Sequence, residues 1–265
     1  MSRGRGASSV EVTTGGPVAR LRLSRPDEGN AIDLELAAGL RNAIDRICDA
    51  GAVVAVLEAQ GPLFCGGGDI AAMAGAADRS AYTRELADTL HDALLAMADS
   101  PVITIAAVHG AVAGAGLGLV LNADLVVAAS GAKFMAAYGS LGVTPDGGAS
   151  YLLPRIAGVL RASEILIGGV SLDAATAHSW GLVNRVVGLD ELPAAVEALA
   201  ASVASTPAAV LAKTKRLISA GLRTDYADPL RAESESISSF IASEESIRRQ
   251  SAFLVRAGRR VPSSP

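Results

Sequence analysis

The sequence predicts an α/β core followed by a helical C-terminal region, and three observations lead to this prediction. Half of the 265 residues are hydrophobic and 19% are charged, which is enough apolar material for one large domain. Short β-rich runs alternate with amphipathic helical stretches along most of the chain. From residue 189 onward only helix-like periodicity remains. We therefore expect a disordered tail over residues 1–9, a core over 10–206 and a helical region over 207–265.

The core elements follow one another in a strand–strand–helix order, without the long spacing of regular βαβ units. Two short strands flank the turn at Gly15 and Gly16. Apolar residues at every third or fourth position predict the helices, and continuous β-rich runs predict the buried strands. The expected elements are strands near 10–12, 18–23, 53–58, 102–108 and 125–128, and helices at 33–50, 81–99 and 114–122.

Composition excludes several classes of function. A net charge of -4 argues against binding to nucleic acid or to an acidic membrane surface. Two cysteines and three histidines are too few for a disulfide framework or a multi-histidine metal site, so we expect no metal. Residues 1–9 lack the apolar stretch of a signal peptide, which indicates a cytoplasmic protein. The uncharged run 100–123 is long enough for a membrane span, but its proline and four glycines favour a buried strand, a turn and a helix.

The first motif is a glycine loop that follows the predicted strand 53–58. Gly66, Gly67 and Gly68 allow main-chain N–H groups to turn outward, where they could stabilise an oxyanion. The alternative is a plain turn before a helix, with Asp69 as the N-cap.

The second motif runs from His109 to Gly118 between a strand and a helix. Its G-x-G-x-G spacing differs from the dinucleotide fingerprint, and no acidic residue follows about 20 positions later. Two interpretations remain, namely a helix N-terminus with exposed amides that attract negative charge, and close helix–strand packing through glycine.

The third motif, residues 142–155, contains a single acid, Asp146, in an apolar stretch. Asp146 could be a general base in a desolvated site. It could equally be the N-cap of the helix that follows.

Together these motifs resemble the crotonase superfamily, also called the enoyl-CoA hydratase/isomerase family, over nearly the whole chain. The matching pieces are Arg25 and Pro26 ahead of Asn30 and Ala31, and residues 64–70, 109–124, 142–148, 181–184 and 252–256. The resemblance implies a spiral of ββα units with a C-terminal helical trimerisation region. It also implies an acyl-CoA substrate, no bound cofactor beyond the CoA of that substrate, and a homotrimer or dimer of trimers.

By position, the family's two oxyanion donors fall on the amides of Gly66 and Ala115. The two glutamates of the family's hydratases fall on Gly118 and Tyr138, so both are missing. Tyr138, with an ordinary pKa of about 10, is a poor base at neutral pH and would donate a hydrogen bond or line the pocket. Asp146 matches the acid of dienoyl-CoA isomerases, epoxyphenylacetyl-CoA isomerases and 4-chlorobenzoyl-CoA dehalogenases, and the surrounding residues are closest to the phenylacetate-type isomerases.

The resemblance therefore favours an enoyl-CoA isomerase, with Asp146 as base. The alternatives are a hydratase with weak activity and a non-catalytic acyl-CoA-binding oligomer. A dehalogenase ranks low because it needs a histidine near Asp146: His109 lies in the wrong place, and His91 and His178 fall on surface-like helix positions. The residues expected to bind substrate are Ala31, Gly68, Asp69, Ile70, Tyr138, Phe253 and Arg256, the last through a CoA phosphate.

Overall fold

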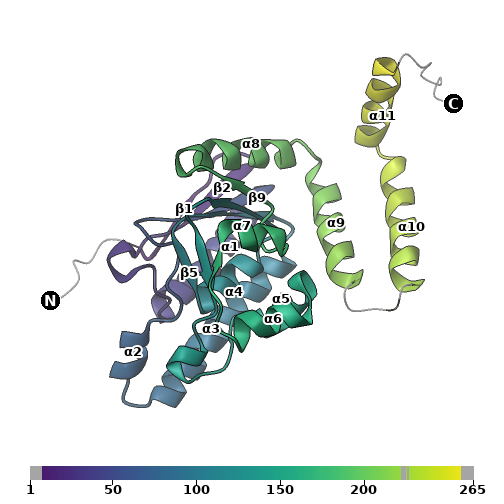
Figure 1. Cartoon of the computed structure of the whole chain (residues 1–265). Helices are drawn as coiled ribbons and strands as arrows, with labels where there is room; N and C mark the ends of the chain where they lie inside the picture. The colour runs from purple at the N-terminus through teal and green to yellow at the C-terminus, as the bar shows by residue number, and fades with distance from the viewer. Residues whose placement is uncertain (1–7, 222–224, 226, 258–265) are drawn as a thin grey trace. The chain divides into compact units, whose positions relative to one another are not determined.

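Two β-sheets and the helices around them make up most of the chain in the computed structural model, which describes residues 8–221, 225 and 227–257 (Figure 1). The chain divides into two units, Met1–Ala208 and Ala209–Pro265. The strands are β1 (Val10–Thr13), β2 (Val18–Leu23), β3 (Val54–Ala59), β4 (Ile103–Val108), β5 (Ala111–Ala113), β6 (Leu125–Ala129), β7 (Lys133–Met135), β8 (Leu172–Asp173) and β9 (Arg185–Val187). The helices of the first unit are α1 (Leu34–Asp49), α2 (Ile70–Gly75), α3 (Arg79–Asp99), α4 (Ala115–Leu121), α5 (Ala149–Ala157), α6 (Val159–Leu166), α7 (Ala174–Ser179) and α8 (Leu192–Ala204).

The larger sheet has the strand order β1-β2-β3-β4-β6-β9 and is parallel except for the β1–β2 pair. Alternate side chains of β3 point to opposite faces, as a strand requires. Val54 and Val56 pack in the cluster that holds α8, whereas Ala55 and Leu57 join the main core with α1 and α3. Helices cover both faces, which explains why β3 and β4 are continuous apolar runs.

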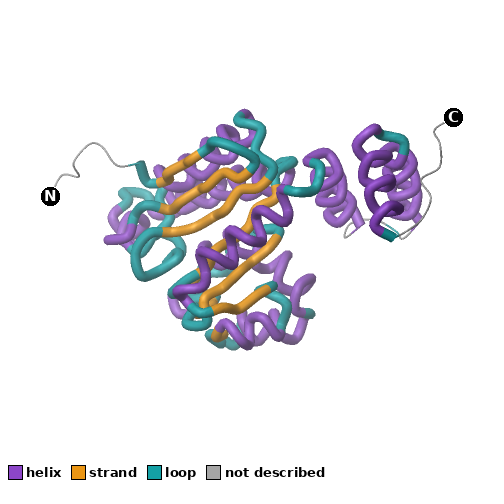
Figure 2. The backbone as a smooth tube through the Cα atoms, turned by 90° about the horizontal axis from the view of Figure 1, so that it is seen from above, coloured by secondary structure: helices purple, strands orange, loops and turns teal. Residues whose placement is uncertain are grey.

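The smaller sheet has the strand order β5-β7-β8 (strands in orange in Figure 2). The loop after β3 forms a bridge to β5 between Cys65 and Val112, and another to the segment before α1 between Gly68 and Ile32. These bridges place the first glycine loop directly against the start of α4.

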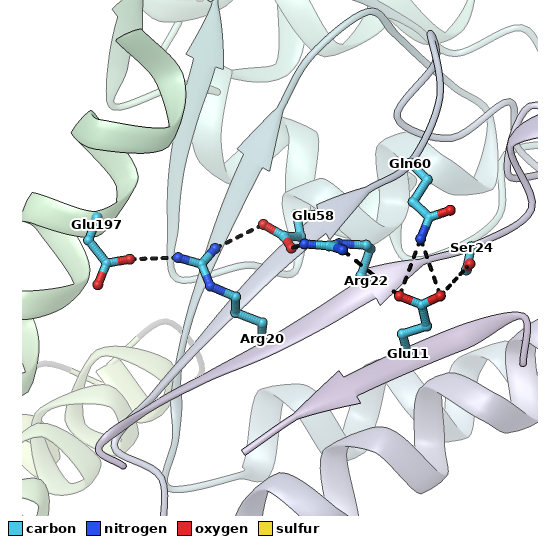
Figure 3. A network of polar contacts seen from close by, with 7 residues as sticks. All are labelled: Glu11, Arg20, Arg22, Ser24, Glu58, Gln60 and Glu197. Atoms are coloured by element: carbon cyan, nitrogen blue, oxygen red, sulfur yellow. Dashed lines mark hydrogen bonds and ion pairs between the residues drawn. The ribbon is translucent and has the colours of Figure 1, made fainter. Parts of the chain in front are cut away.

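A polar network crosses the α8 face of the larger sheet (Figure 3). Glu58 on β3 accepts from both arginines of β2, at 3.0 Å from Arg20 Nη1 and 2.7 Å from Arg22 Nε. Arg20 also reaches Glu197 of α8 at 2.6 Å. Exposed pairs of this kind contribute about 0–1 kcal/mol each, so the network aligns α8 on the sheet more than it stabilises the fold.

The predicted strands and helices of the first unit appear with bounds shifted by a few residues at most. The expected tail is too long at its inner end, because Ser9 is buried and its carbonyl accepts from the Ser24 N–H at 2.9 Å. Residues 1–7 and 258–265 lie outside the described residues.

The second unit consists of helices in its described part: α9 (Ala208–Gly221), α10 (Ala227–Ile241) and α11 (Glu244–Arg256). Ser243 caps α11 by accepting from the Ser246 N–H. Phe253, on α11, is 60% exposed. In the described chain, no single helix is long and apolar enough to cross a membrane, and only α8 and α9 taken together as a bent pair meet the length and composition.

Candidate active site

The central feature of the site is a contact between Asp146 and His91. Asp146 lies in the loop that follows the 3-10 turn η2 (Gly139–Leu141), and its Oδ1 is 2.6 Å from Nε2 of His91 on α3. Both side chains are partly exposed, at 33% and 43%, so the pair is open to a ligand. An ionised carboxylate can only accept, so the imidazole donates from Nε2. His91 is partly exposed, as its surface-like position predicts, but the structure gives it a partner that the sequence did not indicate.

Asp146 does not act as the N-cap of α5, which was the alternative that the sequence left open. Gly148 occupies that position, and no side chain caps the helix. The turn between Asp146 and α5 uses left-handed backbone at Gly147 and Gly148, with φ of +61° and +78°, which glycine adopts without a Cβ clash. This turn leaves the Asp146 carboxylate available to His91.

Tyr138 holds the loop that carries Asp146. Its side chain is buried, and its hydroxyl donates to the main-chain carbonyl of Asp146 at 2.9 Å. Burial raises the pKa of Tyr138 well above its usual value, so the phenol keeps its proton and remains a donor. The hydroxyl that was expected to meet substrate thus holds the loop of Asp146.

Gly118, at one of the two vacant glutamate positions, lies beneath the same loop. A methyl group on Gly118 would lie 2.5 Å from the carbonyl oxygen of Gly147 and 2.9 Å from its Cα. Main chain therefore occupies the space that a side chain at this position would need. The packing of this loop therefore leaves no room for the first hydratase glutamate at position 118.

Two main-chain amides remain as candidate oxyanion donors, and one of them differs from the sequence prediction. The Gly66 N–H already donates to the Gly29 carbonyl at 2.9 Å, so the prediction for Gly66 is corrected. The Ile32 N–H donates to the Gly67 carbonyl, and the Asp69 N–H donates to the Ile32 carbonyl. Because successive amides of an extended segment alternate in direction, the Gly68 N–H points away from Ile32.

Ala115 keeps its predicted place. It is the first residue of α4, where an N–H has no partner within the helix. A methyl group on Gly67 would come within 3.5 Å of the Ala115 nitrogen, so the two glycine loops meet here. Among the described residues, the structure has no hydrogen bond that uses the Gly68 or Ala115 N–H as donor. These two amides fit an oxyanion better than Gly66 does.

The Asp69 side chain has two structural partners, and its expected role in binding substrate stays a prediction. Its Oδ1 accepts from the Ala72 N–H at 2.9 Å and caps α2, and its Oδ2 is 3.1 Å from Nη2 of the buried Arg25. Burial opposes the charged form, but the Ala72 amide and the Arg25 guanidinium outweigh it and lower the pKa of Asp69. Arg25 also donates to the Ala31 carbonyl.

Three of the expected binding residues gather near this ion pair. Gly68 forms the bridge with Ile32, Ala31 precedes Ile32 in the chain, and Ile70, at the start of α2, is 47% exposed. Phe253 and Arg256 belong to α11 in the second unit.

The other candidate groups are structural. Cys65 is buried, and burial raises the pKa of its thiol to about 11. His109 Nε2 lies 2.8 Å from the Gly61 carbonyl, and His178 Nδ1 lies 2.7 Å from that of Val183. In the part of the chain that the structure describes, no three His, Cys, Asp or Glu side chains gather as metal ligands do.

Comparison with known proteins decides the family. The family model "Enoyl-CoA hydratase/isomerase" matches residues 13–257. The chain belongs to the enoyl-CoA hydratase/isomerase family, the crotonase superfamily. Its α/β architecture is the crotonase fold, and the predicted fold class is confirmed. The family assignment leaves open which reaction the chain catalyses.

Relatives with different reactions share this fold. The chain is 38% identical over 199 residues to "Probable enoyl-CoA hydratase EchA14" of Mycobacterium tuberculosis, covering 75% of the chain and 76% of the relative. It is 34% identical over 216 residues to 4-chlorobenzoyl coenzyme A dehalogenase-2 of Arthrobacter sp, covering 80% and 78%. It is 33% identical over 210 residues to 1,2-epoxyphenylacetyl-CoA isomerase of Escherichia coli K12, covering 76% and 78%.

A solved structure with a ligand is also similar. A Thermobifida fusca YX protein in complex with CoA matches with a TM-score of 0.81 and 30% identity, over 89% of this chain and 93% of that one.

Sequence reasoning missed His91 because the residue lies next to the apolar stripe of α3. Leu86, Leu90 and Leu94 form that stripe and are buried. His91 follows Leu90 directly, at the edge of the buried face, where a residue can reach a neighbouring loop. Only this position at the edge of the stripe could have drawn attention to it.

Proposed function

We propose that the protein binds acyl-CoA thioesters and moves a proton on the acyl chain, as an enoyl-CoA isomerase more than a hydratase. The amides of Gly68 and Ala115 would hold the thioester oxygen and stabilise the enolate formed when the neighbouring carbon loses a proton. The Asp146 carboxylate would take that proton and return it two carbons away. His91 would donate its Nε2–H to the carboxylate and keep it oriented.

The observation that carries this proposal is that only one of the three positions where the resemblance places an acid, that of Asp146, holds a carboxylate. Asp146 pairs with His91, the main chain of Gly147 occupies the space next to Gly118, and the Tyr138 hydroxyl donates to the Asp146 carbonyl. Addition of water needs one group to activate the water and another to deliver a proton. A double-bond shift needs only one carrier, and Asp146 can serve as that carrier. The isomerase and the CoA complex among the similar proteins support the same substrate class.

The test compares Asp146→Asn with the parent on trans-2- and trans-3-enoyl-CoA, with products separated by chromatography. We expect the parent to migrate the double bond and the variant to lose about 10²–10⁴-fold, the usual contribution of a general base. Asp173→Asn is a matched control, because Asp173 only caps α7 through the Thr176 N–H. An Asp146→Asn enzyme that works as well as the parent would refute the proposal. Formation of 3-hydroxyacyl-CoA by the parent would instead identify a hydratase, and tight binding without turnover a non-catalytic acyl-CoA binder.

A second function is favoured by the contact between His91 and Asp146. In a hydrolytic dehalogenation, the Asp146 carboxylate would displace halide from an aryl carbon and form an ester. Water deprotonated by His91 would then attack the ester carbonyl and release the hydroxylated acyl group. The argument against this reaction was the lack of a histidine, and His91 Nε2 lies 2.6 Å from Asp146.

Incubation with 4-chlorobenzoyl-CoA separates the two functions. Release of chloride by the parent, together with a covalent aryl ester of Asp146 that His91→Gln retains and mass spectrometry detects, would support the dehalogenase. An isomerase would release no chloride and form no covalent adduct.

We also propose that the chain forms a homotrimer or a dimer of trimers, with Phe253 and Arg256 of α11 near the CoA of the substrate. Phe253 is an apolar side chain left 60% exposed, which supports an interaction there. Light scattering at micromolar concentration tests the assembly, and a monomer would contradict it. A KM for acyl-CoA that is unchanged in Arg256→Ala would contradict the role of Arg256.

A further inference from the structure

We infer that Asn122 is a positioning residue that sets where Asp146 stands relative to the oxyanion amide of Ala115. This inference rests on the proposed function for its effect on catalysis. Asn122 ends α4, and its Nδ2 donates to the Gly118 carbonyl at 2.8 Å and to the Gly147 carbonyl at 3.3 Å. Both partners are acceptors, so only the amide nitrogen can face them. The side chain therefore links helix α4 to the residue that follows Asp146.

The link matters because the same short helix presents the oxyanion donor. Ala115 begins α4 and Asn122 ends it, while Gly147 packs along the side between them. A methyl group on Gly147 would lie 3.3 Å from Gly118 Cα and 3.5 Å from the Ala115 carbonyl oxygen. One rigid element thus fixes both the thioester oxygen, through the Ala115 N–H, and the backbone of the base.

Two side chains hold successive carbonyls of this loop. Tyr138 Oη binds the Asp146 carbonyl at 2.9 Å, and Asn122 Nδ2 binds that of Gly147. Among the described residues, the structure has no other hydrogen bond to the Gly147 carbonyl. The Gly147 carbonyl belongs to the Gly147–Gly148 peptide. Both glycines have left-handed backbone, so this stretch has little steric restraint of its own. Without Asn122, the Gly147–Gly148 peptide could rotate, and the change would pass through Gly147 to the Asp146 carboxylate.

The kinetic experiment compares Asn122→Ala and Asn122→Asp with the parent. We expect kcat to fall by roughly 10–100-fold in Asn122→Ala, since a displacement of about 1 Å costs up to ~10²-fold, with KM changed by less than about twofold. Asn122→Asp should lose at least as much, because a carboxylate would face two carbonyl oxygens. Asn184→Ala is the matched control: Asn184 Oδ1 accepts from the Val126 N–H at 2.7 Å, so this variant loses a similar bond away from the loop. Its melting temperature should fall about as far, with kcat within about threefold of the parent.

A second measurement does not depend on activity. The chain has three histidines, so their ring signals can be resolved by NMR. We expect Asn122→Ala to shift the ring signals of His91, the partner of Asp146, and to leave those of His109 and His178 in place.

The outcomes separate this inference from the proposed function. An Asn122→Ala enzyme that keeps its kcat, while Asp146→Asn is inactive, would overturn the inference and leave the proposed function standing. If Asp146→Asn is active, the proposed function fails, and the His91 signals still decide whether Asn122 positions Asp146. Unchanged His91 signals would overturn the inference in either case.

Discussion

Gly118 offers the sharpest test of how this site differs from one with two carboxylates. In Gly118→Ala, the new methyl group would lie 2.5 Å from the Gly147 oxygen and 2.9 Å from the carbon that bears it. Both contacts are to main chain, which cannot rotate away as a side chain could. The loop must lift off α4, and Asp146 must move with it. We therefore expect this single methyl group to act on catalysis more than on folding.

Two opposing effects determine how Gly118→Ala changes the free energy of unfolding. Overpacking of this kind costs about 1–3 kcal/mol, and alanine in place of glycine inside a helix regains about 1 kcal/mol. The net loss is then about 0–2 kcal/mol. At ~2–4 °C per kcal/mol for a domain of this size, the melting temperature should fall by at most ~8 °C. The same displacement of the base should reduce kcat by roughly 10²-fold.

The assay measures kcat, KM and melting temperature for Gly118→Ala beside Gly131→Ala. Gly131 has open space around its Cα, so its variant isolates the general effect of a methyl group. Gly118→Glu, which supplies the missing hydratase acid, should gain no hydration of trans-2-enoyl-CoA. If Gly118→Ala keeps its kcat, or if Gly118→Glu adds water, the packing argument is wrong.

Three further predictions concern the groups around the site. Burial raises the pKa of the Cys65 thiol from its ordinary value of 9.0 to about 11, so the unfolding free energy should fall by roughly 2–3 kcal/mol as pH rises from 9 to 11. Urea titrations should show that Cys65→Ala lacks this part of the decline. Asp69→Asn removes one of the two carboxylates that face the buried Arg25, while Asp33 stays 3.1 Å from its Nη1, so the variant should cost about 1.5–3 kcal/mol near neutral pH. Because the folded pKa of Asp69 is lowered, the difference from the parent should shrink as acid protonates the parent carboxyl, and a difference independent of pH would contradict the ion pair. Tyr138→Phe, which loses the hydrogen bond to the Asp146 carbonyl, should destabilise by about 1 kcal/mol and lower kcat up to tenfold with KM unchanged, and a rise in KM alone would instead place Tyr138 against substrate.

Local patterns along the chain were sufficient for the architecture. The apolar runs of β3 and β4 and the stripe on α1 are properties of neighbouring residues, and each appears where the sequence predicts it. The order and spacing of the motifs were sufficient for the family. The vacancy at Gly118 was also visible in the sequence.

The roles inside the site depended on contacts between distant segments. His91 and Asp146 are 55 positions apart, and the Gly66 N–H donates to the carbonyl of Gly29, 37 residues earlier. Such pairings depend on how loops from different strands cross, which periodicity does not encode. The sequence indicated Asp146 as the candidate acid. Only the fold showed its histidine partner, and only the fold showed that the Gly66 amide, unlike that of Gly68, already donates to a carbonyl. The reason is physical: a hydrogen bond is decided by a few ångströms in space, and the chain's local preferences constrain distances only between near neighbours.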